Sequence, residues 1–242
     1  MSDLGKYFLF IASLFKNRLP FKLYLKQTLI ECINIGINSI FLVVIISIFM
    51  GAVTAVQTAY NLQGPLFQNF LLGLIIRDMT ILELAPTITS LVFAGKVGSR
   101  IAGELGTMRI TEQIDALETM GINAGSYLIL PKICATLWMY PLLVILAGFL
   151  SIYGGLLISD FLNIVPHNDF LVGLRINFNL YNIFFSLAKS FTFAFLISSI
   201  ASYRGFYTFG GALEVGKAST KAVTHSCIAI LITDYFLAQL FL

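Results

Sequence analysis

Long apolar runs alternate with short polar stretches along the 242 residues of this chain. Five runs are long enough to cross a bilayer as helices, because about 20 apolar residues span its hydrocarbon core. We predict spans at residues 35–59, 70–95, 133–158, 181–203 and 222–241. The pattern therefore predicts an all-α integral membrane protein built as one membrane domain.

The N-terminal segment, residues 1–31, combines aromatic and leucine side chains with four lysines and one arginine beside them. This composition is typical of an amphipathic helix that lies at the membrane surface, with its cations toward anionic headgroups. Pro20 is expected to divide this interfacial helix into two pieces, because proline interrupts helix hydrogen bonding. A disordered basic tail is the alternative, and the high aromatic content argues against it.

Lysine and arginine indicate the topology, since cytoplasmic loops carry an excess of both. An N-terminus in the cytoplasm places twelve of the 15 cationic residues on that side. Only Arg77, Arg175 and Lys189 then lie toward the outside. With five spans, the C-terminus is predicted to lie outside.

Three stripes of small residues recur at four-residue spacing, which lets neighbouring helices approach closely. One lies on the first span, one lies in the first part of the charged stretch described next, and one lies on the third span, which we expect Pro131 to open. Their members are Gly51, Ala55 and Ala59; Gly98, Ala102 and Gly106; and Ala147, Ser151, Gly155 and Ser159.

The stretch from Phe93 to Gly121 is too charged to face lipid, because each central charge costs about 2.5 to 3.5 kcal/mol. Ile110, Ile114 and Leu117 recur at helical spacing, acidic residues occupy another face, and Gly121 is suited to end the helix. We predict a cytoplasmic helix over 104–121, between spans 2 and 3. It either docks on a partner or lies on the headgroups. Its charged candidates are Glu104, Arg109, Glu112, Asp115 and Glu118.

Three ionisable residues lie at similar depth inside predicted spans: Glu83, Lys189 and Asp234. A rise of 1.5 Å per residue places each of them about 20 Å from the cytoplasmic boundary. Intramembrane charges are costly and usually pair or face a polar cavity. We therefore expect Glu83 and Lys189 to pair where they meet a lipid headgroup. The alternative is a buried pair that only fixes helix register.

Composition excludes most other functions. Hydrophobic residues make up 58% and charged residues 11%, which leaves no room for a soluble catalytic domain. Three separated cysteines and two histidines do not suggest a metal site, and a net charge of +3 does not suggest nucleic acid as a partner. Residues 211–218 approach a phosphate-binding loop, but Ala218 stands where a hydroxyl is required. We expect no catalytic residue and no cofactor.

Two long motifs, LELAPTITSLVFAGKVGSRIAGELGTMRITEQIDALETMGI and KASTKAVTHSCIAILITDYFL, together with YLILPKI, resemble the MlaE-type permeases. These are membrane subunits of lipid ABC transporters that work with MCE-domain proteins. The resemblance covers residues 30–241. It implies a homodimer in the bacterial inner membrane that moves phospholipids between the inner and outer membranes, driven by a partner ATPase.

The same resemblance implies roles for individual residues. The region from Glu104 to Gly121 corresponds to the coupling helix that docks on the ATPase. Glu83 and Lys189 match residues near the lipid cavity of the family, and Asp234 matches an acidic residue of the last span. The family motif R-E-L-G-P reads L-E-L-A-P at residues 82–86, so the arginine before the glutamate is absent.

A second functional class fits the same charges. A self-contained secondary transporter or channel would use Glu83, Lys189 and Asp234 as an ion relay, without an ATPase. A membrane scaffold without transport activity is a third, weaker alternative.

Overall fold

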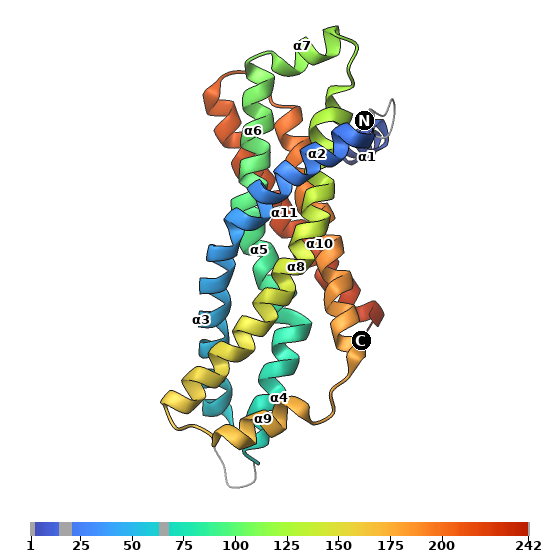
Figure 1. The fold of residues 1–242 in the computed structure, drawn as a ribbon. Coiled ribbons are helices and arrows are strands. Elements are labelled where there is room, and N and C mark those ends of the chain that lie inside the picture. Colours follow the sequence, from blue (N-terminus) through green and yellow to red (C-terminus); the bar gives the residue numbers. More distant parts are fainter. Residues whose placement is uncertain (1–2, 15–20, 63–67, 242) are drawn as a thin grey trace.

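The computed structural model describes residues 3–14, 21–62 and 68–241, and all regular structure in these ranges is helical. Four of the described helices are long and apolar enough to cross a membrane. They form an elongated bundle with α7 at one end and α9 at the other (Figure 1). The predicted all-α membrane class is confirmed, and the predicted number of five spans stays a prediction beside these four candidates.

The N-terminal region contains α1 (Asp3–Leu14), α2 (Phe21–Cys32), η1 (Ile33–Ile37) and α3 (Asn38–Asn61), where η marks a π-helix. No break separates the predicted interfacial segment from the first span, because the helix continues from α2 through η1 into α3. Phe10 of α1 is buried against the aromatic rings of Tyr203, Phe206 and Tyr207. The interruption predicted at Pro20 lies outside the described residues.

The second predicted span belongs to a continuous helical path in which α and π turns alternate. It comprises α4 (Phe70–Met79), η2 (Thr80–Ile88), α5 (Thr89–Phe93), η3 (Ala94–Gly98) and α6 (Ser99–Ile110). Pro86 lies inside η2 and removes one backbone donor there. These π segments are the reason that 70–95 is not one uninterrupted α-helix.

The rest of the chain forms α7 (Gln113–Thr119), α8 (Ala124–Phe161), α9 (His167–Arg175), α10 (Leu180–Phe206) and α11 (Ala212–Phe241). The predicted opening of the third span at Pro131 is wrong, because α8 already begins at Ala124. Asn123 caps that end by accepting a hydrogen bond from the Ser126 backbone amide at 3.1 Å. Pro131 is accommodated inside the helix, as membrane helices allow.

The packing of α3 against α8 depends on residues with small side chains or none. A Cβ atom on Gly51 would lie 1.7 Å from the backbone oxygen of Ser151. A Cβ atom on Gly154 would lie 2.4 Å from the backbone oxygen of Ile48. Ala55 and Ser151 are buried beside these contacts. The predicted small-residue stripes on the first and third spans are therefore confirmed as a packing face.

The third stripe packs α6 against α10 and α11. A Cβ atom on Gly205 would lie 2.7 Å from the backbone oxygen of Ala102. Gly98 faces Ile197 of α10, and Gly106 faces Val215 of α11. The charged end of the second helical path is thereby held against the last two long helices.

The predicted single helix over 104–121 is wrong, because the chain contains two helices there. Helix α6 ends at Ile110, and Glu112 adopts the left-handed conformation with φ of 58° before α7 begins. The residues expected to form one amphipathic face therefore belong to different helices. The predicted stop at Gly121 is confirmed by its φ of +76° and by the bond from the Ile122 amide to the Leu117 carbonyl at 3.0 Å.

We predict that Gly51→Ala destabilises the protein, because the added methyl group would overlap the α8 backbone. Overpacking of this kind costs about 1 to 3 kcal/mol. Gly216→Ala in α11 is the matched control, since no atom lies within 4 Å of its Cβ position. Thermal unfolding of both variants in the same detergent measures the difference, and equal midpoints would contradict the packing described here.

Candidate functional site

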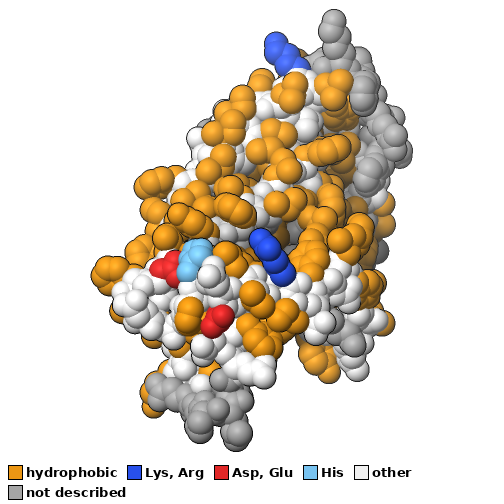
Figure 2. All heavy atoms as spheres, turned by 60° about the horizontal axis from the view of Figure 1, so that its bottom comes forward, with side chains coloured by type: hydrophobic (Ala, Val, Ile, Leu, Met, Phe, Trp, Pro, Cys, Tyr) orange, Lys and Arg blue, Asp and Glu red, His pale blue; other side chains and the backbone are white. Residues whose placement is uncertain are grey.

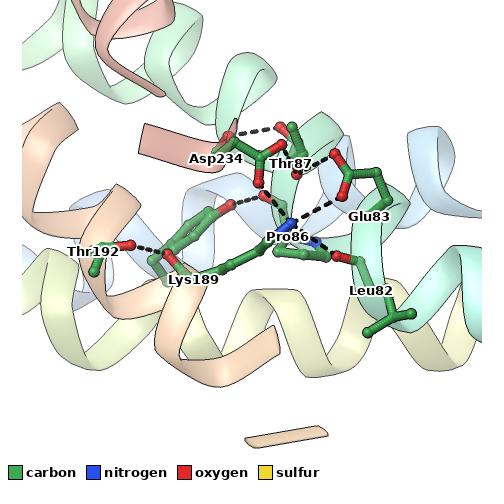
Figure 3. Close-up of polar contacts among 9 residues, drawn as sticks. Leu82, Glu83, Pro86, Thr87, Lys189, Thr192 and Asp234 are labelled. Atoms are coloured by element: carbon green, nitrogen blue, oxygen red, sulfur yellow. Dashed lines mark hydrogen bonds and ion pairs between the residues drawn. The ribbon is translucent and has the colours of Figure 1, made fainter. Parts of the chain in front are cut away.

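The side chain of Lys189 lies at the centre of a charged cluster among the long helices (Figure 3). Its Nζ atom is 2.9 Å from Glu83 Oε2 and 2.6 Å from Asp234 Oδ1. The three residues come from α10, η2 and α11, which are far apart in sequence. One ammonium group therefore joins two carboxylates on separate helices.

The local backbone supplies a third acceptor to Lys189. Lys189 Nζ donates to the carbonyl of Leu82 in η2 at 3.2 Å. The lysine is thereby joined to the backbone of η2 as well as to the two carboxylates.

Neutral hydroxyl groups complete the cluster. Thr87 lies between the two carboxylates, with its Oγ1 3.4 Å from Glu83 Oε1 and 3.3 Å from Asp234 Oδ2. The hydroxyl of Tyr140 donates to the carbonyl of Pro86 at 2.7 Å. The ring of Phe185 lies 4.9 Å from Lys189 Nζ, close enough for a cation–π contact. These contacts fix the position of each charged group.

The three charged side chains differ sharply in exposure. Lys189 is 0% exposed and Asp234 is 11% exposed, whereas Glu83 is 52% exposed. Lys189 and Asp234 are thus buried within the single chain, and Glu83 lies at its surface. A molecule that approaches the cluster from outside meets the Glu83 carboxylate first.

The predicted pairing of Glu83 with Lys189 is confirmed in its geometry. The depth estimate placed Asp234 at the same level without assigning it a partner, and the structure brings it to the same ammonium. The role of the three residues in lipid binding stays a prediction.

Arg77 does not replace the arginine that is absent before Glu83. Its guanidinium donates to the carbonyls of Leu174 at 3.0 Å and Ile176 at 2.7 Å, and it pairs with Asp78 at 2.8 Å. It is 3% exposed. Arg77 therefore caps the C-terminal end of α9 and holds that helix against α4.

A second buried lysine was not singled out by the sequence. Lys132 of α8 pairs with Glu31 of α2 at 2.7 Å and with Glu104 of α6 at 2.9 Å. Its side chain is 3% exposed. All three residues border apolar runs at the same end of the bundle, which is the signal that could have revealed them. Glu104, a predicted partner-docking residue, thus has an internal partner.

The other predicted docking residues surround the junction of α6 and α7. Arg109 pairs with Asp115 at 2.8 Å, and its guanidinium lies over the rings of Phe206 and Phe209. Glu112 and Glu118 are exposed. The junction therefore presents carboxylates outward and is tied to the end of α10 through Arg109.

The long apolar helices define a multi-pass membrane protein. A family model described as Permease MlaE matches residues 28–240. The chain belongs to the MlaE permease family and is a permease subunit of an ABC transporter, which implies a membrane location and a partner ATPase.

Relatives extend over nearly the whole chain. A probable ABC transporter permease of Rickettsia bellii is 34% identical over 99% of this chain and 92% of its own length. A probable ABC transporter permease of Synechocystis is 34% identical over 96% of this chain and 88% of its own length. Protein TRIGALACTOSYLDIACYLGLYCEROL 1 of Arabidopsis thaliana is 31% identical over 91% of this chain and 63% of its own length.

We predict that Lys189→Met strongly destabilises the protein, because it leaves Asp234 buried without a cation. Removal of one partner from a buried ion pair costs on the order of 3 to 5 kcal/mol. A triple variant that adds Glu83→Gln and Asp234→Asn should recover much of the loss, since no charge then remains unpaired. Thermal unfolding compares the two variants, and a triple variant no more stable than Lys189→Met would contradict this account.

Proposed function

We propose that this ABC transporter permease moves phospholipids or related lipids between the inner and outer membranes. It works as a homodimer, with the lipid path at the dimer interface and ATP hydrolysis in the partner subunit. The observation that carries the proposal is the half-exposed Glu83 beside the buried Lys189. A charged group at the surface of an apolar bundle suits a ligand that has both a polar headgroup and apolar chains.

The charge distribution supports an orientation for the transporter. Exposed or partly exposed cations gather at the end that carries α7, among them Arg109, Arg204 and Lys217. The opposite end shows few charged side chains among hydrophobic ones (Figure 2). By the positive-inside rule, the α7 end lies in the cytoplasm and the N-terminus is cytoplasmic.

The partners follow from this orientation. The junction of α6 and α7 is the coupling surface for the ATPase, and Glu112 and Glu118 are its outward carboxylates. An MCE-domain protein occupies the opposite side, near α9. The name of the plant relative contains that of a galactolipid, which supports a lipid substrate.

We expect rigid helices to transmit a movement of the ATPase to the lipid site. Arg109 ties α7 to α6 through Asp115 and contacts the end of α10 through Phe206. Lys189 lies in the N-terminal half of α10, and Phe206 is its last residue. A displacement of the coupling surface by the ATPase therefore shifts α10 as a body and alters the contacts of Lys189.

The first test is affinity purification of the protein from its native membrane, with mass spectrometry of the bound proteins and lipids. We expect an ATPase, an MCE-domain protein and phospholipid. Glu118→Arg should reduce recovery of the ATPase about tenfold, which corresponds to 1.4 kcal/mol of binding. Arg175→Glu is the matched charge reversal at the opposite end and should leave recovery unchanged.

Recovery of the protein without any ATPase, from membranes treated gently enough to preserve complexes, would contradict the proposed assembly. Lipid movement that follows a proton gradient and needs no ATP would favour an ion relay through Glu83, Lys189 and Asp234 instead.

Glu83→Gln tests the lipid site. Because Glu83 is half-exposed, loss of its charge should leave folding and ATPase association intact. We expect lipid transport by the reconstituted complex to fall about tenfold, in line with the loss of one charge contact. Glu31→Gln removes a carboxylate from the other buried lysine, Lys132, and is the matched control. Equal transport by Glu83→Gln and the parent would show that the charge pair only fixes helix register.

A further inference from the structure

Lys189 is enclosed by partners from its own chain. Its Nζ atom donates hydrogen bonds to Glu83 Oε2 at 2.9 Å and to the Leu82 carbonyl at 3.2 Å, and it forms an ion pair with Asp234 Oδ1 at 2.6 Å. With its side chain 0% exposed, Lys189 offers no surface to an approaching phosphate. A headgroup phosphate could reach it only by displacing contacts that hold three helical segments together.

Glu83, in contrast, has acceptor capacity to spare. Its Oε2 atom accepts from Lys189, and its Oε1 atom lies 3.4 Å from the Thr87 hydroxyl, which is long for an O–H···O bond. An ionised carboxylate accepts about four hydrogen bonds. A donor that arrives from outside the chain can therefore bind Glu83 without disturbing Lys189.

The cluster also carries excess negative charge, because two carboxylates share one ammonium. Within the described residues, no other cation forms an ion pair with Glu83. Arg77, the nearest arginine in sequence, is committed to Asp78 and to the end of α9. Leu82, the residue before Glu83, is apolar. The accessible charge at this site is thus negative.

An uncompensated carboxylate at membrane depth is costly and draws a counter-cation. We propose that Glu83 binds the ammonium group of a zwitterionic phospholipid, so that the transporter selects amine-bearing headgroups over purely anionic ones. The inference rests on the proposed lipid function and adds the chemical class of its substrate. The ammonium donates to the free acceptor positions of Glu83 and restores charge balance, while Lys189 keeps its partners.

The test uses the complex with its ATPase, reconstituted in nanodiscs with equal amounts of phosphatidylethanolamine and phosphatidylglycerol of identical chains. Lipid that stays bound after detergent extraction is quantified by mass spectrometry. We expect the parent protein to enrich the ethanolamine lipid about three- to tenfold, the scale of one ion pair of about 0.7 to 1.4 kcal/mol. Glu83→Gln should bind both lipids equally. Glu31→Gln, which changes a carboxylate of the Lys132 cluster, should keep the preference of the parent.

A change in the lipid avoids any effect of substitution on folding. Phosphatidylethanolamine with an acetylated amine keeps its phosphate and chains but loses the ammonium. We expect the parent protein to bind it no better than phosphatidylglycerol.

Three results would overturn the inference: equal binding of the two lipids, enrichment of the anionic lipid, or an unchanged preference in Glu83→Gln. Equal binding is also the result expected if a proton, rather than an amine, neutralises Glu83. A complex that retains and transports neither lipid would instead contradict the proposed function itself.

Discussion

The ammonium of Lys189 is the contact on which the centre of this bundle depends. It joins η2, α10 and α11, and the hydrogen bond from Thr87 to Asp234 adds a second polar link between η2 and α11. Apolar contacts alone specify helix register weakly, because neighbouring ridges and grooves are alike. A buried charge with three fixed acceptors admits a single register. It therefore sets the depth at which Glu83 reaches the surface.

The Lys132 cluster repeats this arrangement near the α7 end. There too a buried lysine joins carboxylates from two other helices, α2 and α6. The two clusters lie at different levels of the bundle, and α6 and η2 belong to the same helical path. This path is thus held at Glu83 and again at Glu104, while glycine contacts hold α3 against α8. The position of Glu83 relative to the coupling surface is fixed by these constraints together.

The sequence predicted the features that follow from the spacing of small residues and from the energetic cost of a charge inside the membrane. Charges inside apolar runs are costly unless they pair, so the pairing of Glu83 with Lys189 could be predicted from their similar depth in the membrane. Small residues at four-residue spacing marked the close contact at Gly51. The break at Glu112 could not be found in this way, because a left-handed glutamate has no distinctive sequence signal. The positions of Lys132 and Glu31 beside apolar runs mark them as candidates, but they lie 101 residues apart, so their pairing depends on tertiary packing.

The π segments explain why a single α-helical period does not describe the second helical path. They also make the orientation of its outer half sensitive to its length. A π turn accommodates one more residue than an α turn, so it changes the helical phase of everything beyond it. Arg77 in α4 faces α9, Glu83 in η2 faces α10, and Ala102 in α6 faces the glycine of α10. Deletion of one residue within η2 would convert it toward an α-helix and rotate α4 against α6. A change of length here therefore acts as a change in the orientation of the outer half of this helical path.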